Sequence, residues 1–288
     1  MVQLVDSDIK TREVLDWTGL HIFHYPASSC SQKTRIVLNL KGLEWESHIV
    51  NLRNKENNEE WFLGINPRGL VPVMVHDGAV HIESNDIIMY IDEHFPHPKL
   101  VPTNLERDTA SLLRHEDELH LDLRSLTMRY LLPPGNVGKS PETLANYRRL
   151  GSGTVRGVPD PMKEVQFQFW HGINQHGGVT DEAVAIAAKR FRDALGELDE
   201  TLEEQRFLLG DAITLVDIAW FVYVNRLSPI GYPLAELHPR VAAWFSGLMA
   251  RPEFADEVAM PAAQRDDLKA RQAAERRAGT HLRDVAGF

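Results

Sequence analysis

The sequence predicts two domains, a small α/β domain followed by a larger all-helical one. Residues 20–95 alternate between strand-like and helix-like patterns, whereas the clearly periodic segments beyond residue 104 repeat at three and four residues, which is typical of helices. Three prolines between residues 96 and 102 interrupt the pattern and indicate a boundary. A chain of 288 residues, 43% of them hydrophobic, suits two domains better than one. We expect an extension over 1–18, an α/β domain over 19–97 and a helical domain over 104–288.

The α/β domain is predicted to begin with a strand, a helix and a second strand. Residues 20–25 form an apolar strand, residues 33–40 carry apolar side chains at helical spacing before a stop at Gly42, and residues 45–51 form another strand. A βαβ unit of this length implies parallel strands and a right-handed crossover. Residues 1–18 show a weak helical period at best, and we expect them to pack on the surface.

A hairpin and a helix complete this domain. Residues 71–75 form a strand that opens with a proline, Asp77-Gly78 is a hairpin turn, and residues 79–82 return antiparallel. We expect Ser84 to cap a helix whose apolar residues face one way. The order βαβ then ββα describes a thioredoxin-like sheet covered by helices.

The rest of the chain is predicted to be helical, with one long interruption. Residues 131–180 are rich in glycine and proline, among them Pro133, Pro134 and Gly135, and also contain Phe167, Phe169 and Trp170. A stretch of this length without regular structure is usually a functional lid or a partly disordered insertion. We assign it to the helical domain. Periodic helices flank it and follow it over 110–130, 181–203, 215–225 and 240–249.

Composition narrows the classes of function. The net charge of −10 argues against nucleic acid as a partner, and no apolar run approaches the ~20 residues of a membrane span. Cys30 is the only cysteine, which excludes an internal disulfide and fits a reducing cytoplasm. His115 and His120 are spaced to lie on different faces of a helix, so we expect no metal site.

The strongest local signal combines Gly69-Leu70-Val71-Pro72 with Glu83-Ser84. A proline that opens a strand after a turn is a candidate for a cis bond and leaves the Val71 backbone available to an extended peptide. The helix start at Ser84 favours a carboxylate, and Glu83 suits an ammonium group. Each feature alone has a structural explanation, as a routine cap or an edge strand. A ligand with an extended backbone, a carboxylate and an amine at one end, and a thiol in the middle satisfies all three features.

These residues carry a resemblance to a known family. The stretch Ser28 to Leu43, with Asn66-Pro67-Arg68-Gly69-Leu70-Val71-Pro72 and Glu83-Ser84, resembles the amino-terminal domain of glutathione transferases, and its serine-rich turn resembles the zeta class. The helical domain resembles the family through Gly210 to Ala219, within which Thr214 and Asp217 form a predicted capping box. The tail from Asp266 to Gln272 is similar to bacterial glutathione-dependent β-aryl etherases of lignin breakdown.

The resemblance implies a thioredoxin-like domain followed by an all-helical glutathione transferase domain. It implies glutathione as cosubstrate, a small electrophile as second substrate, a role in detoxification and a cytoplasmic homodimer. Ser28 falls at the catalytic serine of the zeta class, with Ser29 and Cys30 as further catalytic candidates. The residues implied to hold glutathione are Arg68, Val71, Pro72, Glu83 and Ser84.

Several functions remain open on the sequence alone. The leading hypothesis is a glutathione transferase that activates the thiol for attack on an aromatic or apolar electrophile, because Phe167, Phe169 and Trp170 suit such a substrate. Related alternatives are a β-aryl ether lyase and a zeta-type isomerase. A non-catalytic glutathione-binding regulatory protein is the alternative of another class, and a thiol-disulfide oxidoreductase is disfavoured because Cys30 lacks a CxxC partner. We expect the 131–180 insertion to govern substrate choice and not glutathione affinity.

Overall fold

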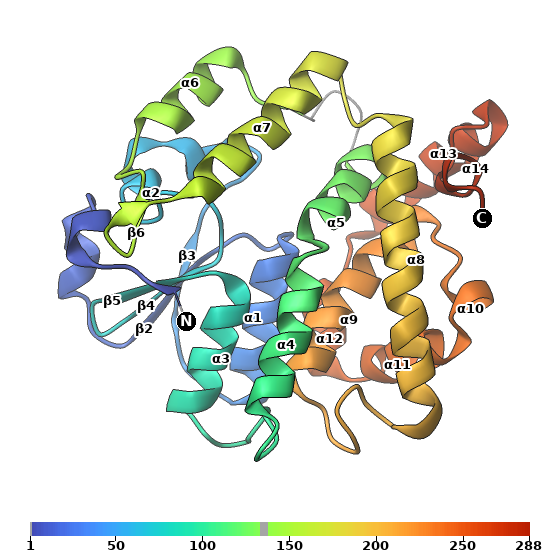
Figure 1. Cartoon of the computed structure of the whole chain (residues 1–288), viewed down its shortest axis with the longest axis horizontal. Coiled ribbons are helices and arrows are strands. Elements are labelled where there is room, and N and C mark those ends of the chain that lie inside the picture. The colour runs from blue at the N-terminus through green and yellow to red at the C-terminus, as the bar shows by residue number, and fades with distance from the viewer. Residues whose placement is uncertain (1, 133–137) are drawn as a thin grey trace. The chain divides into compact units, whose positions relative to one another are not determined.

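The computed structural model describes residues 2–132 and 138–288 and forms two compact units (Figure 1). The first unit comprises Met1–Pro98 and Gly138–Gly177, and the second comprises Lys99–Val137 and Gly178–Phe288. Most of the predicted insertion is therefore grouped with the α/β unit, whereas we assigned it to the helical domain. Pro133, Pro134 and Gly135 lie outside the described residues.

The first unit contains the predicted thioredoxin-like sheet, in the order β1-β5-β4-β2-β3. Strands β2 and β3 are parallel, and β4 is antiparallel to both β2 and β5. The elements of this sheet and its helices are β1 (Val2–Gln3), β2 (Leu20–His24), α1 (Ser29–Leu40), β3 (Glu46–Ile49), α2 (Glu60–Leu63), β4 (Val73–His76), β5 (Ala79–Ile82) and α3 (Ser84–His94).

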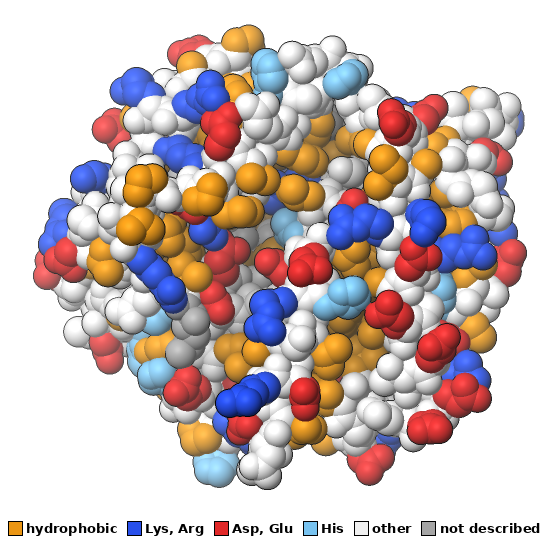
Figure 2. Space-filling view, viewed as in Figure 1, with side chains coloured by type: hydrophobic (Ala, Val, Ile, Leu, Met, Phe, Trp, Pro, Cys, Tyr) orange, Lys and Arg blue, Asp and Glu red, His pale blue; other side chains and the backbone are white. Residues whose placement is uncertain are grey.

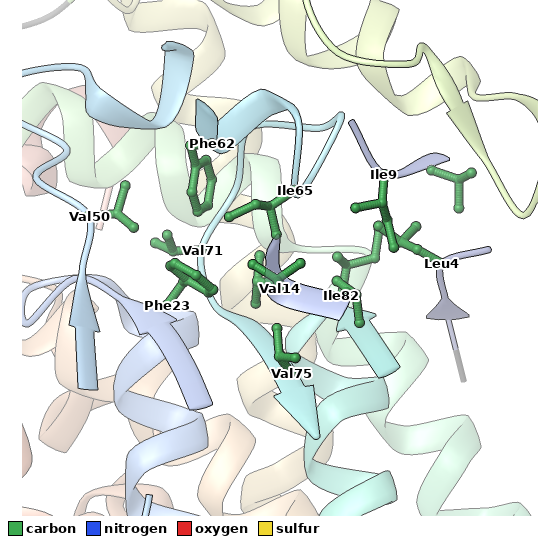
Figure 3. Packing of buried hydrophobic residues seen from close by; sticks show 13 residues of the cluster. Leu4, Ile9, Val14, Phe23, Val50, Phe62, Ile65, Val71, Val75 and Ile82 are labelled. Carbon is green, nitrogen blue, oxygen red and sulfur yellow. The ribbon is translucent and has the colours of Figure 1, made fainter. Parts of the chain in front are cut away.

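The extension before β2 is part of the core of this unit. Strand β1 pairs antiparallel with β5 and adds a strand to the sheet that the sequence did not predict. Leu4, Ile9 and Val14 are almost fully buried, and Figure 3 shows them packed with residues of the sheet and of the α2 region. The expectation that residues 1–18 pack on the surface is therefore wrong. The three apolar residues are five apart, a spacing that matches neither the helical nor the strand period.

The insertion folds as two helices joined by a short hairpin and packs within the first unit. Asp8 accepts hydrogen bonds from Thr154 Oγ1 at 2.6 Å and from the Gly157 N–H at 3.0 Å. Lys139 Nζ donates to Asn58 Oδ1 at 2.7 Å. These contacts join polar residues that are far apart in sequence, so the periodic pattern of apolar residues could not predict them. The elements are α6 (Pro141–Arg149), β6 (Thr154–Val155), β7 (Val158–Pro159) and α7 (Pro161–His176).

The second unit is helical, as predicted, and is built around a helix that is buried almost throughout. That helix, α9, opens with the predicted capping box between Thr214 and Asp217. The predicted helix over 110–130 is divided into two helices and a π-helical turn at Thr127–Leu131. The helices of this unit are α4 (Glu106–Asp117), α5 (His120–Leu126), α8 (Asp181–Glu204), α9 (Leu215–Leu227), α10 (Leu234–Leu237), α11 (Pro239–Met249), α12 (Pro252–Val258), α13 (Ala262–Ala278) and α14 (Leu282–Ala286).

Charged side chains of both signs lie on the surface. Acidic and basic side chains are intermixed over the face drawn in Figure 2. Within the described part of the chain, the helices lack the combination of length and apolar character that a membrane span requires.

Candidate functional site

Three strands bring the candidate residues to one edge of the sheet, meaning here the side at which the ends of these strands meet. Phe23 of β2 pairs with Val73 of β4, which in turn pairs with Ile82 of β5. Because β4 is antiparallel to both neighbours, the end of β2, the start of β4 and the end of β5 meet at the same edge. Ser28 follows β2, Val71 precedes β4, and Glu83 with Ser84 follows β5. The predicted site residues therefore gather at this edge.

Ser28 is the N-cap residue of α1. Its Oγ accepts a hydrogen bond from the Ser31 N–H at 3.3 Å, and its backbone is extended, with φ of −79° and ψ of 125°. A hydroxyl whose oxygen accepts from the helix can still donate its own proton to another group. Ser29 and Cys30 form the first turn of the same helix, and all three side chains are half-buried. An anion at this position would meet a hydroxyl donor and the positive end of the helix dipole.

Both ring nitrogens of His24 are engaged with Arg35 and Ser47, so His24 is not placed to take a proton from Ser28. Its Nδ1 accepts from Arg35 Nη1 at 3.1 Å, because a guanidinium can only donate, so Nε2 donates to Ser47 Oγ at 2.7 Å. Burial, together with the charges of Arg35 and His48, lowers the pKa of His24 to about 4. Arg35 also donates to the Pro26 carbonyl at 3.0 Å and so steadies the turn that leads to Ser28.

The Val71-Pro72 bond is cis, as the sequence predicted. The paired residues of β4 begin at Val73, so Val71 lies outside the registers with β2 and β5. Both Val71 and Pro72 are buried. The Val71 backbone therefore lies before the strand, outside both registers.

Glu83 and Ser84 open α3, but their roles differ from the prediction. Glu83 is the N-cap residue, with a φ of 70° and no capping hydrogen bond from its side chain, and Ser84 is the first residue of the helix. The expectation that Ser84 caps α3 is wrong, because the turn at Glu83 already starts the helix. Lys33, which is fully buried in α1, donates to Asn85 Oδ1 at 2.7 Å and ties α1 to the first turn of α3. Ser84 thus lies at a helix start that Lys33 ties to α1.

Arg68 joins the insertion to Glu83. Its Nε and Nη2 donate to the two carboxylate oxygens of Asp160 at 2.7 and 2.8 Å, and its Nη1 donates to Glu83 Oε1 at 2.6 Å. The side chains of Arg68 and Asp160 are 12% and 3% exposed. Burial opposes the charge of Arg68, but the hydrogen bonds and charges of Asp160 and Glu83 prevail and raise its pKa. Arg68, a predicted glutathione contact, is thus engaged with two carboxylates.

The sequence analysis did not identify Asp160. It is the N-cap residue of α7, and its carboxylate also accepts from the Met162 N–H at 3.3 Å. The signal available was an aspartate directly before a proline, which is a common helix start. Nothing in the sequence links it to Arg68, 92 residues away.

The turn that carries Arg68 is fixed by its neighbours from both parts of the unit. The Tyr147 hydroxyl of α6 donates to the Arg68 carbonyl at 2.9 Å, and Asn57 Nδ2 donates to the Gly69 carbonyl at 2.8 Å. Gly69 has a φ of 61°, and a Cβ there would lie 2.8 Å from the Asn57 carbonyl oxygen. Only glycine fits this turn without displacement.

The aromatic residues of the insertion lie on α7 within the first unit. The Arg148 guanidinium lies 3.8 Å from the centre of the Phe167 ring, and Lys139 Nζ lies 4.8 Å from that of Trp170. Phe169 packs edge-on against Trp170. All three rings are half-buried.

Two family comparisons match the two parts of the chain. Residues 27–94 match the amino-terminal domain of glutathione S-transferase, and residues 181–246 match its carboxy-terminal domain. Protein LigF of Sphingobium sp. strain SYK-6 is 25% identical over 268 residues, which cover 88% of this chain and 97% of LigF. The chain belongs to the glutathione transferase superfamily. The predictions of family and fold class are confirmed.

Other members of the superfamily match over different lengths. Glutathione S-transferase Z2 of Arabidopsis thaliana is 40% identical, but the match covers 41% of this chain and 49% of that protein. The crystal structure of the β-etherase LigF superposes with a TM-score of 0.67 over 83% of this chain and 98% of LigF, at 25% identity. A glutathione transferase homologue from Drosophila mojavensis with bound glutathione has a TM-score of 0.62 over 88% of this chain and 96% of the homologue, at 17% identity, and supports the fold.

Proposed function

We propose that this protein is a glutathione transferase that activates the glutathione thiol for attack on a small apolar or aromatic electrophile. The meeting of Ser28, Val71 and Ser84 at one edge of the sheet supports this function. An extended tripeptide paired with Val71 would place its γ-glutamyl carboxylate at the start of α3 and its thiol near the start of α1.

Ser28 would donate a hydrogen bond to the thiolate sulfur. A free thiol with a pKa of ~8.5 is only about 3% ionised at pH 7. A pKa lowered by roughly two units, equivalent to ~2.7 kcal/mol, makes most of it thiolate. One donor to an anion contributes ~1.5–3 kcal/mol and the helix end ~0.3–1 kcal/mol, so a shift of this size lies within the range that the two groups together can supply.

Ser28→Ala tests this role through the ultraviolet absorbance of the bound thiolate, titrated against pH. The pKa of bound glutathione should rise toward that of the free tripeptide, and turnover should fall tens-fold with little change in affinity. Ser246→Ala is the matched control, because Ser246 is an exposed helical serine whose hydroxyl donates to the Ala242 carbonyl. If Ser28→Ala keeps the wild-type thiol pKa and rate, activation resides elsewhere, and Ser29→Ala and Cys30→Ala are the next variants.

The insertion supports an apolar electrophile. Met162, Val165 and Phe169 lie at helical spacing on one face of α7, and the first two are 37% exposed. Turnover of a panel of aromatic electrophiles tests this choice. A protein that binds glutathione but converts none of them would instead be a regulatory glutathione-binding protein.

Cleavage of β-aryl ethers is the second candidate, favoured by the match to LigF over almost its entire length. In this reaction the thiolate would attack the carbon that carries the aryloxy group, a carbon–sulfur bond would form as the carbon–oxygen bond breaks, and a phenolate would leave and take up a proton from solvent. Release of a phenol from a β-aryl ether ketone with glutathione present, and none with Ser28→Ala, tests it. A zeta-type isomerase has less support, because the match to Glutathione S-transferase Z2 covers only 49% of that protein.

A further inference from the structure

Three side chains of the first unit form a cluster away from the glutathione site. His21 in β2 stands beside Glu46 in β3, and His48 lies two residues further along β3, so all three face the same side of the sheet. His21 Nδ1 lies 3.1 Å from His48 Nε2 and 3.4 Å from Glu46 Oε2. Each residue offers one ligand atom, and the three atoms lie within 4.8 Å of one another.

The hydrogen bond of His21 to Thr18 orients the unprotonated nitrogen of its ring, Nδ1, toward this cluster. His21 Nε2 lies 2.9 Å from the Thr18 carbonyl oxygen. Because a carbonyl only accepts, Nε2 carries the proton, and Nδ1 of the neutral ring keeps its lone pair toward His48. Histidines that bind metals almost always donate their other N–H to a carbonyl or carboxylate in this way.

The two rings are held by aromatic packing. The Trp17 ring lies 4.7 Å from the ring of His21 and 4.8 Å from that of His48, centre to centre. Phe23 stacks on His48 at 4.8 Å. The side chains of His21 and His48 are 10% and 23% exposed, whereas Glu46 is 66% exposed. An ion can therefore enter from the solvent side onto two preoriented rings.

We propose that His21, Glu46 and His48 bind a zinc ion. With zinc–nitrogen bonds of about 2.0–2.1 Å, nitrogens this far apart subtend an angle of roughly 100° at the metal, close to tetrahedral. Three protein ligands leave the fourth position to water. The ion replaces the proton that His48 Nε2 now donates to His21 Nδ1, and this proton moves to His48 Nδ1.

The sequence predicted no metal site, because the ligands are far apart along the chain. His21 and His48 are separated by 27 residues, and only the parallel register of β2 and β3 brings them together. The ion fastens the edge strand β3 to β2 and, through Thr18, to the extension. His21 lies near the start of β2 and Ser28 follows its end, so zinc binding leaves the glutathione site intact.

Calorimetric titration of the chelator-treated full chain with zinc sulfate tests the proposal, in a buffer without thiols because thiolates bind zinc. We expect wild type to bind one zinc ion that His48→Gln and Glu46→Gln lose or bind at least about ten-fold more weakly. Cobalt substitution should give the absorption of a tetrahedral site in wild type and not in His48→Gln. Zinc should also raise the melting temperature of wild type and leave that of His48→Gln unchanged.

The chain has thirteen histidines, so a matched control is required. His176→Gln removes an exposed histidine whose Nδ1 bonds to the Gly172 carbonyl at the end of α7, and it should bind zinc like wild type. His48→Gln should still bind glutathione, which separates a failed site from a failed fold. Absence of zinc binding by wild type, or equal binding by His48→Gln, overturns the proposal.

Discussion

Replacing Asp160 by asparagine asks whether the insertion supports glutathione binding from a distance. The asparagine keeps the shape of the side chain and an oxygen for the start of α7, but it loses the charge and one of the two parallel bonds to Arg68. Arg68 then turns its charge toward Glu83, whose carboxylate is proposed to hold the γ-glutamyl amine. Both the orientation of Glu83 and its attraction for an ammonium group should weaken.

The expected size follows from burial. The side chains of Arg68 and Asp160 are largely buried, and removing one partner of a buried ion pair typically costs about 3–5 kcal/mol of folding stability, which is an upper range for this part-buried pair. The loss of binding free energy for glutathione should be smaller than this loss of folding stability, because the bond between Arg68 and Glu83 remains and Glu83 is 30% exposed. Taking the lower end of a charge-assisted hydrogen bond, ~1.5 kcal/mol, the affinity for glutathione should fall about ten-fold.

Calorimetric titration with glutathione, at a temperature where urea denaturation shows the variant folded, is the assay. Glu164→Gln is the matched control, since it makes the same chemical change on α7 at an exposed ion pair with Arg148. Surface pairs contribute ~0–1 kcal/mol, so this control should match wild type. An unchanged dissociation constant in folded Asp160→Asn would refute the coupling. It would restore our first expectation, that the insertion governs substrate choice alone.

Three further predictions follow from the site and the fold. Ser84→Ala should weaken glutathione binding markedly by calorimetry, because the start of α3 is proposed to hold the γ-glutamyl carboxylate; an unchanged affinity would contradict that placement. The protein should have the mass of a two-fold dimer by light scattering at micromolar concentration, as the family resemblance implies, and a monomer mass would refute this. Burial and the charge of Arg35 lower the pKa of His24 to about 4, below the ~6.5 of the unfolded chain. As pH falls, His24 therefore takes up a proton in the unfolded state before it does so in the folded state. Its contribution to the free energy of unfolding is present above pH ~6.5 and is lost as pH falls toward 4. Urea denaturation should show a loss of about 2 kcal/mol from this group between pH 7 and 5, and His24→Gln should show a smaller loss; an equal loss in both proteins would contradict the assignment.

Periodic patterns predicted the elements of the sheet well. The antiparallel strand β5 has the predicted bounds, 79–82, because a two-residue turn fixes both ends of a hairpin strand. The capping box at Thr214 and Asp217 was equally local. The cis bond before Pro72 was also predicted from neighbouring residues.

Features made by distant pairs were not predictable in the same way. Asp160 reaches Arg68 across 92 residues, and its role depends on how α7 packs, which no local pattern encodes. The extension was missed because its buried residues follow no regular period. The prediction for Ser84 differed by one residue, because the positive φ of Glu83 starts the helix earlier than a serine cap would. Candidate residues for the site could thus be proposed from local sequence, whereas the contacts that support them required the fold.

The short strand β1 has a consequence for self-association. A sheet edge with unpaired backbone groups is a template for strands of other molecules. β1 covers the outer side of β5 at its final two residues, and its own two residues offer little to a neighbouring chain. The opposite edge, β3, carries Glu46 and His48, which are poor partners for an incoming strand. A variant that lacks β1 would expose the unpaired backbone groups of β5. It should therefore aggregate during folding at concentrations at which the whole chain does not.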